Sequence, residues 1–273
     1  MSPIAIVEEE ALNIDVIRHR LTTRTVGRRI VLHEVVASTN ATLRELADAG
    51  ASEGTVVLAE HQTAGRGRGN KAWFSPPGVN LCASILFRPP IPAAAAPGFA
   101  FITSLALADA IRELGVRGGL KSPNDVLVQG RKVAGVHAEM TARGGAVGYI
   151  VLGVGANLNV THEALRTGLG ETAPFATSLR EALGRAVDRN AFAARFLTCL
   201  EERLDMYQAK GASAILEGWR AHDVVTGRRV EVREGPIAFD GRALGVDAEG
   251  HLQVEDAHKC VHRVVASEVR LVE

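Results

Sequence analysis

The character of the sequence changes once, near Asp223, and this change constrains the fold more than any other feature. Before it, from residue 31 onward, apolar runs of strand length mix with longer helical patterns. After it, short β-type segments are separated by five glycines, a pattern typical of a small all-β barrel. The sequence therefore predicts a mixed α/β (α+β) domain with a central mixed sheet over residues 30–222. A helix and linker over 1–29 precede it, and a barrel over 223–273 follows.

Periodicity predicts the individual elements of the body. Helices are predicted over residues 8–21, from Ser38 or Thr39 to Ala49, and over 99–114, 190–207 and 212–220. Strands are predicted over residues 55–59, 79–87, 125–128, 132–140 and 146–154. Apolar residues alternate through 79–87, which is typical of a strand with one buried face. The basic cluster at Arg24, Arg28 and Arg29 is interpreted as part of a solvated linker.

Composition excludes several classes of protein. With 31 basic and 31 acidic residues, the chain lacks the basic surplus typical of nonspecific binding to nucleic acid or anionic membranes. Its three cysteines have no spacing that suggests a disulfide framework. The most apolar stretch, 92–114, is interrupted by polar and helix-breaking residues, which favours a buried helix over a membrane span. We therefore expect a protein of the reducing cytoplasm, with neither nucleic acid nor membrane as partner.

A loop over residues 60–73 alternates glycine with arginine. Its centre reads Gly65, Arg66, Gly67, Arg68, and it ends at Trp73. Backbone N–H groups and two guanidinium groups on one loop suit anionic oxygens, phosphate above all. The spacing matches neither a Walker P-loop nor a dinucleotide fingerprint. Taken alone, the pattern is equally typical of a phosphate-binding loop and of a flexible surface loop.

Two further stretches place polar residues beside turns and glycines. In residues 121–125, Pro123 holds a turn whose next two residues can bond their own backbone. Lys121 and Lys132 bracket this turn and indicate a site for a charged ligand, although each lysine alone is as typical of a solvated surface. In residues 153–159, the glycines let a flat ligand approach a strand end. The alternative there is a strand that ends in an Asn-rich turn.

Together and in this order, these stretches resemble the biotin–protein ligase family. The matching pieces are Ser38-Thr39-Asn40, residues 60–68 with Trp73, the KxPND box at 121–125, RKVAG at 131–135 and GVGANLN at 153–159. Ser122 departs from the family box, which usually has a tryptophan there. The resemblance implies a catalytic domain related to the class II synthetase-like biotin/lipoate ligases, followed by an SH3-like barrel. It also implies the monofunctional class, without an N-terminal DNA-binding domain.

The resemblance implies both an activity and residue roles. The family joins biotin to ATP as biotinyl-5′-AMP, then transfers biotin to a lysine of a biotin carboxyl carrier protein. Catalytic roles fall on Lys132, Arg66, Arg68 and Lys121. Biotin contacts fall on Ser38, Thr39, Asn40, Gln62, Gly65, Arg66, Lys132, Gly135, Gly153 and Gly155. Contacts to ATP or the adenylate fall on Arg68, Trp73, Asn124, Asp125, Lys132 and Asn157, with Mg²⁺ on the phosphates and no protein metal ligand assigned.

These residue types suit the implied chemistry. Joining a carboxylate to an α-phosphate brings two anions together, so fixed positive groups such as Lys132 must stabilise them. Gly135, Gly153 and Gly155 would let the biotin ring lie against the backbone. Trp73 would stack on adenine, or else pack in the core. A lipoate ligase and a noncatalytic biotin sensor acting on DNA remain as alternatives, and dimerisation is left open.

Overall fold

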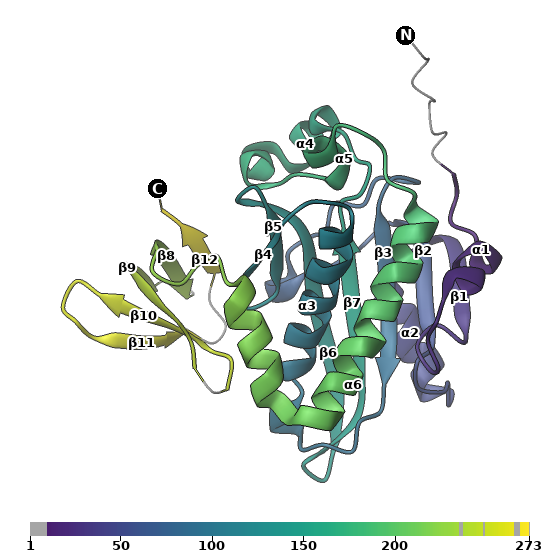
Figure 1. The fold of residues 1–273 in the computed structure, drawn as a ribbon, viewed down its shortest axis with the longest axis horizontal. Helices are drawn as coiled ribbons and strands as arrows, with labels where there is room; N and C mark the ends of the chain where they lie inside the picture. The colour runs from purple at the N-terminus through teal and green to yellow at the C-terminus, as the bar shows by residue number, and fades with distance from the viewer. Residues whose placement is uncertain (1–9, 235–236, 248, 265–267, 273) are drawn as a thin grey trace.

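The computed structural model describes residues 10–234, 237–247, 249–264 and 268–272 (Figure 1). A seven-stranded mixed sheet in the order β1-β2-β3-β7-β6-β5-β4 forms its centre. The strands are β1 (Ile30–Val36), β2 (Val56–Gln62), β3 (Leu81–Phe87), β4 (Gly118–Lys121), β5 (Asp125–Val128), β6 (Arg131–Arg143) and β7 (Ala146–Ala156). β1 and β2 pair in parallel, and the other neighbours in this sheet pair antiparallel. The mixed sheet predicted from the sequence is thus confirmed.

Helices cover both faces of this sheet (Figure 1). They are α1 (Ile14–Arg20), α2 (Thr39–Asp48), α3 (Gly98–Glu113), α4 (His162–Leu169), α5 (Leu179–Leu183) and α6 (Arg189–His222), with short 3-10 turns η1 (Arg68–Asn70), η2 (Ala93–Ala95) and η3 (Gly170–Phe175). α3 and α6 pack on one face over the main core, which contains Leu58 and Leu105. α2 packs on the opposite face, where Leu43 meets Val57 and Val151. Alternate residues of the central strands therefore pack into two separate cores, one on each face of the sheet.

The apolar stretch 92–114 forms the core helix α3, as expected. A segment over Ala93–Glu113 is long and apolar enough to cross a bilayer. In the fold it is mostly buried, and its residues Ile102, Leu105 and Ile111 are fully enclosed in the main core. Burial between the sheet and α6 accounts for its hydrophobicity without a membrane.

Several element predictions need correction. The helix predicted over 8–21 begins only at Ile14, because the Asn13 side chain accepts the free N–H groups of Asp15 and Val16 and caps it there; residues 8 and 9 lie outside the described residues. β3 was expected to bury one face, yet all seven of its residues are buried, because it is a central strand covered on both sides. The sequence prediction also missed β1, β4, α4 and α5. The helices predicted over 190–207 and 212–220 form one element, α6, interrupted at Gly211, where φ is 76°.

The segment predicted as a solvated linker is instead fastened to α6. The Glu201 carboxylate accepts hydrogen bonds from the backbone N–H groups of Arg24, Thr25 and Val26 at 2.6–3.0 Å. Burial alone would raise the pKa of Glu201, but these hydrogen bonds outweigh it and hold that pKa below its usual value. The Arg24 guanidinium also pairs with Asp205 at 2.6 Å. The three arginines of this segment are exposed, as the solvated-linker interpretation predicts, but its backbone is fixed to α6.

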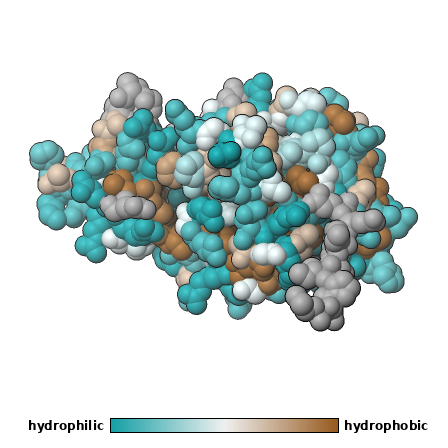
Figure 2. All heavy atoms as spheres, turned by 90° about the horizontal axis from the view of Figure 1, so that it is seen from above, coloured by the Kyte–Doolittle hydropathy of each residue, from teal (hydrophilic) through white to brown (hydrophobic). Residues whose placement is uncertain are grey.

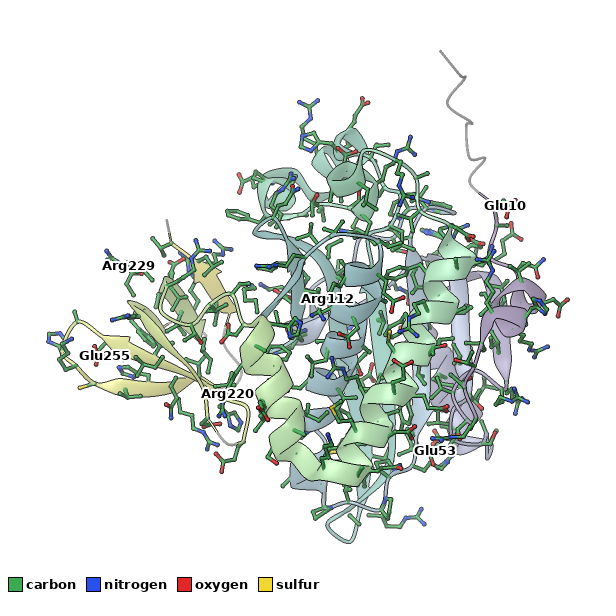
Figure 3. All side chains as sticks on the ribbon, viewed as in Figure 1. Glu10, Glu53, Arg112, Arg220, Arg229 and Glu255 are labelled. Atoms are coloured by element: carbon green, nitrogen blue, oxygen red, sulfur yellow. The ribbon has the colours of Figure 1, made fainter. Side chains whose placement is uncertain are left out.

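The C-terminal residues form a second, antiparallel sheet. Its strands, β8 (Arg229–Glu234), β9 (Ile237–Val246), β10 (Leu252–Asp256), β11 (Val261–Val264) and β12 (Glu268–Leu271), lie in the order β11-β10-β9-β8-β12. Val230, Val232 and Val254 belong to its separate core. At the junction with α6, Arg220 donates a hydrogen bond to the Val246 carbonyl at 3.1 Å (Figure 3). A second β unit is thus confirmed, whereas the exact domain limits stay a prediction.

The surface that Figure 2 shows is mainly hydrophilic, with small separate hydrophobic areas. The large apolar side chains that are most exposed in the described residues come from different elements: Val35, Met140, Phe175, Leu244 and Val261. Of these, Phe175 also lines the cavity described next. Scattered apolar side chains of this kind are ordinary on a protein surface and do not by themselves indicate a docking face.

Candidate active site

The sheet face opposite α3 and α6 carries two rows of residues centred on glycine. The strand register places Gly153 between Ser84 and His137, and Gly155 between Cys82 and Gly135. Because glycine has no side chain, side chains from other segments can lie directly on the strand backbone here. This part of the sheet lies beside the N-terminus of α2.

A cavity of about 560 Å³ opens over this part of the sheet. Every site residue predicted from the sequence lines it except Gly65, which is buried behind the wall and accepts a hydrogen bond from the Trp73 N–H. Among the described residues that line it, Asp125 is the single carboxylate. The cationic side chains on the wall are Arg66, Arg68, Lys71, Lys121, Lys132, Arg233 and Arg270. This excess of positive charge favours an anionic ligand.

A Lys–Asp–Lys cluster forms at one end of the cavity, where the β4–β5 turn meets β6. The Asp125 carboxylate contacts the ammonium group of Lys132 at 2.6 Å and that of Lys121 at 2.8 Å. Burial alone would raise the pKa of Asp125, but the two ammonium groups outweigh it and lower that pKa. Lys121 also donates to the Val269 carbonyl of β12 at 3.1 Å. The sequence placed both lysines at this site, but gave no sign that β12 contacts it.

Trp73 lies flat on the sheet beside this cluster. The Lys132 ammonium is 5.6 Å from the centroid of its ring, within range of a cation–π interaction. The space that Gly155 leaves is filled by Trp73, and the space that Gly153 leaves is filled by Asn40. In this structure these side chains lie next to the two glycines, which also line the cavity, and contact between the glycines and a ligand ring stays a prediction. Within the described residues, the buried Trp73 Nε1 has no hydrogen-bond partner.

A group of hydrogen-bonded polar side chains forms another part of the wall. Gln62 Oε1 accepts from the Thr39 N–H at 2.8 Å and lies 3.1 Å from the Thr39 hydroxyl. The Ser84 hydroxyl lies 2.7 Å from Thr39 Oγ1 and 2.6 Å from Asn40 Oδ1. Ser38 is the N-cap residue of α2, as predicted, but its side chain makes no capping hydrogen bond. The motif Ser38-Thr39-Asn40 and the distant Gln62 therefore meet at one place.

The Gly-Arg loop is an ordered hairpin at the cavity wall. The Gly67 N–H donates to the Lys71 carbonyl at 2.7 Å, and the Trp73 N–H donates to the Gly65 carbonyl at 2.9 Å. Gly69 sits at the tip with φ of 65°, a conformation that glycine adopts without strain. Both arginines of this loop thus lie beside the cavity on a folded turn.

Two predicted adenylate residues are held by the protein itself. The Asn124 side chain donates to the Val136 carbonyl at 2.6 Å, and the Asn157 side chain donates to the Thr177 carbonyl at 3.0 Å. Both line the cavity. These bonds hold the wall in shape, and direct contact with a nucleotide stays a prediction.

Sequence reasoning missed two parts of the wall. Leu165, Leu169 and Phe175 come from α4 and η3, and Arg270 comes from β12. α4 had a readable signal, since Thr161 caps it and Leu165 and Leu169 are four residues apart. No local pattern marks Arg270, because only the packing of the second sheet brings it to the cavity.

We expect Gly155→Ala to destabilise the fold. A Cβ atom at this position would lie 2.2 Å from the Trp73 ring, so the indole must move. Overpacking of this kind typically lowers the free energy of unfolding by about 1–3 kcal/mol. Urea unfolding measures the effect against Gly98→Ala, which has no neighbouring atom within 4 Å of the added methyl group. Equal stability of the two variants would contradict the packing described for Trp73.

The sheet and the cavity define a class of protein: a mixed α/β protein with a cationic cavity suited to an anionic small molecule. The model of the biotin/lipoate A/B protein ligase family matches residues 32–157. A bifunctional ligase/repressor BirA from Bacillus subtilis is 33% identical over 256 residues, covering 93% of this chain and 78% of that protein. A biotin–[acetyl-CoA-carboxylase] ligase from Mycobacterium tuberculosis is 36% identical over 223 residues, covering 79% of each chain.

The fold also matches solved structures. A biotin protein ligase from Aquifex aeolicus in complex with biotin and ATP superimposes with a TM-score of 0.75 at 24% identity, covering 90% of this chain and all of that one. The chain belongs to the biotin/lipoate A/B protein ligase family. The family resemblance and the fold class inferred from the sequence motifs are both confirmed.

Proposed function

We propose that this chain is a biotin–protein ligase that makes biotinyl-5′-AMP from biotin and ATP and transfers biotin to a lysine of a carrier protein. The observation that carries the proposal is one cavity with the Lys121–Asp125–Lys132 cluster and the polar group around Thr39 on its wall. The cluster suits a carboxylate and a phosphate, whereas the polar group suits a hydrogen-bonding head. Relatives named as biotin–[acetyl-CoA-carboxylase] ligases support this choice of substrate.

The first step brings two anions together. A carboxylate oxygen of biotin attacks the α-phosphorus of ATP, the bond to the bridging oxygen breaks, and pyrophosphate leaves with its electron pair. Lys132, held by Asp125 at 2.6 Å, places a fixed positive charge beside the reacting groups. Arg66 and Arg68 on the hairpin add charge at the phosphates.

The second step transfers the biotinyl group. The amine of an acceptor lysine attacks the carbonyl carbon of the adenylate, and AMP leaves with the bonding electrons. The cavity must hold the adenylate away from water until then, since the mixed anhydride hydrolyses when exposed. We propose a biotin carboxyl carrier protein as the acceptor, a choice supported by the relative named biotin–[acetyl-CoA-carboxylase] ligase.

Mg²⁺ fits this site only as an ion that arrives on ATP. Among the described lining residues Asp125 is the single carboxylate, and its two oxygens already contact Lys121 and Lys132. Carboxylates are the protein ligands that Mg²⁺ usually takes. We therefore assign no metal ligand to the chain. We further propose a reducing, cytoplasmic location, because ATP is a substrate and Cys82, Cys199 and Cys260 are all free thiols.

The decisive experiment is pyrophosphate release from ATP in the presence and absence of biotin. We expect release that depends on biotin and is not supported by lipoic acid, since the lipoyl head lacks the hydrogen-bonding groups that the Thr39 cluster would serve. Release with lipoic acid alone would favour the lipoate-ligase alternative. A gel shift with DNA that does not depend on biotin would favour the noncatalytic sensor.

We expect Arg68→Gly to release the adenylate from the site. Arg68 lines the cavity on the hairpin, so its loss should affect retention of biotinyl-5′-AMP more than synthesis, for which Lys132 remains. Free adenylate would then label lysines of unrelated proteins. The measurement is a biotin blot of a lysine-rich bystander protein, with Arg28→Gly at an exposed site far from the cavity as control. Labelling confined to the carrier, with normal adenylate formation, would contradict this role.

A further inference from the structure

We propose that Glu139 is a positioning residue for biotin recognition: it fixes the orientation of the Asn40 amide and so sets the direction of the hydrogen bonds that end at Thr39. The proposal rests on the biotin–protein ligase function proposed above. Glu139 lies on β6, two residues beyond His137, and faces α2. Glu139 does not line the cavity, so it would act on biotin through Asn40 and not by direct contact.

The contacts of Glu139 determine which way Asn40 points. Its Oε1 accepts from Asn40 Nδ2 at 2.7 Å, and its Oε2 pairs with Arg44 at 3.0 Å. Arg44 follows Asn40 by one turn of α2, on the same face of the helix. An ionised carboxylate only accepts hydrogen bonds. Asn40 must therefore turn its NH₂ group toward Glu139 and its carbonyl oxygen toward Ser84.

The orientation of Asn40 passes along a short hydrogen-bonded chain. The Asn40 oxygen carries no proton, so the single proton of the Ser84 hydroxyl, 2.6 Å away, is donated to it. With the Ser84 proton on Asn40, the proton of the Thr39 hydroxyl has two acceptors within reach, Ser84 Oγ at 2.7 Å and Gln62 Oε1 at 3.1 Å. Gln62 Oε1 still accepts from the Thr39 N–H at 2.8 Å. The Thr39 hydroxyl consequently offers lone pairs to the cavity, which suit an N–H group of the biotin ureido head.

Burial makes this direction matter. Thr39, Asn40 and Ser84 are 3%, 6% and 0% exposed, so water does not compete for their hydrogen bonds. Gly153 leaves the space for Asn40, since a Cβ atom there would lie 2.3 Å from Asn40 Oδ1. A reversed Asn40 would point its oxygen at the Glu139 carboxylate, a buried mismatch that is costly, whereas its NH₂ group could still donate to the Ser84 hydroxyl. With an amide at position 139 this mismatch disappears, and the 3.4 Å contact of Asn40 Nδ2 with the His137 carbonyl is what still favours the present orientation.

The test compares Glu139→Gln with Arg44→Met in the full-length protein. Biotin affinity is measured by calorimetry, and KM and kcat by biotin-dependent pyrophosphate release. For Glu139→Gln we expect the Kd and KM for biotin to rise about tenfold, as for the loss of one well-directed hydrogen bond, with kcat and the KM for ATP within about twofold. Arg44→Met removes the ion pair but keeps the accepting carboxylate. We expect the Kd and KM for biotin of Arg44→Met to stay within about twofold of the unaltered protein. The Arg44 side chain is half exposed, and an exposed ion pair contributes little.

A charge exchange provides the rescue. Asn40→Asp alone sets two carboxylates against each other where the present contact is 2.7 Å, and should be the most damaging change. In Asn40→Asp/Glu139→Gln the carboxylate at position 40 accepts both from Ser84 and from the amide at position 139. This restores the original direction of the chain. We expect the biotin Kd of the double variant to return to within about threefold of the original protein.

The outcomes separate this proposal from the function on which it rests. Failure of the unaltered protein to bind biotin overturns the biotin–protein ligase proposal. If the unaltered protein and Glu139→Gln bind biotin equally well, the role of Glu139 is overturned. The role is also overturned if Glu139→Gln loses kcat and ATP affinity by the same factor as it loses biotin affinity. If Glu139→Gln fails to fold, the double variant decides. Recovery of both the melting temperature and the biotin affinity supports the role, and failure to recover them overturns it.

Discussion

Replacing Lys132 with alanine is expected to lower biotinyl-5′-AMP formation about 100- to 1000-fold, the usual loss for one charge-stabilising donor in an active site. Lys132 lies 2.6 Å from Asp125 and 5.6 Å from the Trp73 ring centroid, so its ammonium group is held in place before the substrates bind. Its side chain is 35% exposed, so we expect little change in folding. The measurement is biotin-dependent pyrophosphate release by purified protein.

The control for this experiment is Lys210→Ala, which removes an exposed lysine from α6. We expect that variant to match the unaltered protein in rate and melting temperature. Near-normal turnover by Lys132→Ala would show that Lys132 does not stabilise the reacting anions. A large loss of melting temperature in Lys132→Ala would instead indicate that its pairing with Asp125 is mainly structural.

Asp125→Asn is expected to cause the largest loss of stability among these changes. Asp125 is 14% exposed at its side chain and neutralises both Lys121 and Lys132, so its removal leaves two ammonium groups without their carboxylate. Breaking a buried pair by removing one partner typically costs about 3–5 kcal/mol. Urea unfolding at neutral pH measures this difference, with Glu53→Gln at an exposed loop position (Figure 3) as the matched control.

The pH dependence of this effect has a defined sign. The pKa of Asp125 is lowered in the folded protein, mainly because two ammonium groups outweigh the effect of its burial. A carboxyl whose pKa is lowered on folding stabilises the protein above its unfolded pKa, near 4, and this stabilisation disappears as the pH falls through the folded pKa. We expect the difference in free energy of unfolding between the unaltered protein and Asp125→Asn to be largest at neutral pH and to disappear in acid below about pH 4. A difference that stays constant in acid would contradict the ion-pair origin of the effect.

Local patterns in the sequence predicted most of the elements that build the site. Strands β5, β6 and β7 were predicted from apolar runs of strand length, and the turn between β5 and β6 has positive φ values at Gln129 and Gly130. The ordered motifs also identified the residues on the cavity wall, from Thr39 to Asn157. These features were readable because strand period, turn chemistry and motif order are properties of short segments.

Other features depend on pairing between distant segments. The buried state of β3 follows from its central place in the sheet, since the same alternating segment at a sheet edge would expose one face. Likewise, Trp73 packs on Gly155, which lies 82 positions away in the chain, because the hairpin folds back on the sheet. A single residue's pattern cannot reveal such contacts, because they depend on the strand register.

The sequence by itself determined the family, the mixed α/β body and many of the polar, charged and glycine residues on the cavity wall, because these follow from motifs and short-range periodicity. Only the tertiary structure decided how those residues are held. The Lys121–Val269 contact joins the two sheets, and the Asn40–Glu139 contact joins residues 99 positions apart. Such contacts form only when helices and sheets pack together, and their free energy depends on burial and on partners that no local segment contains.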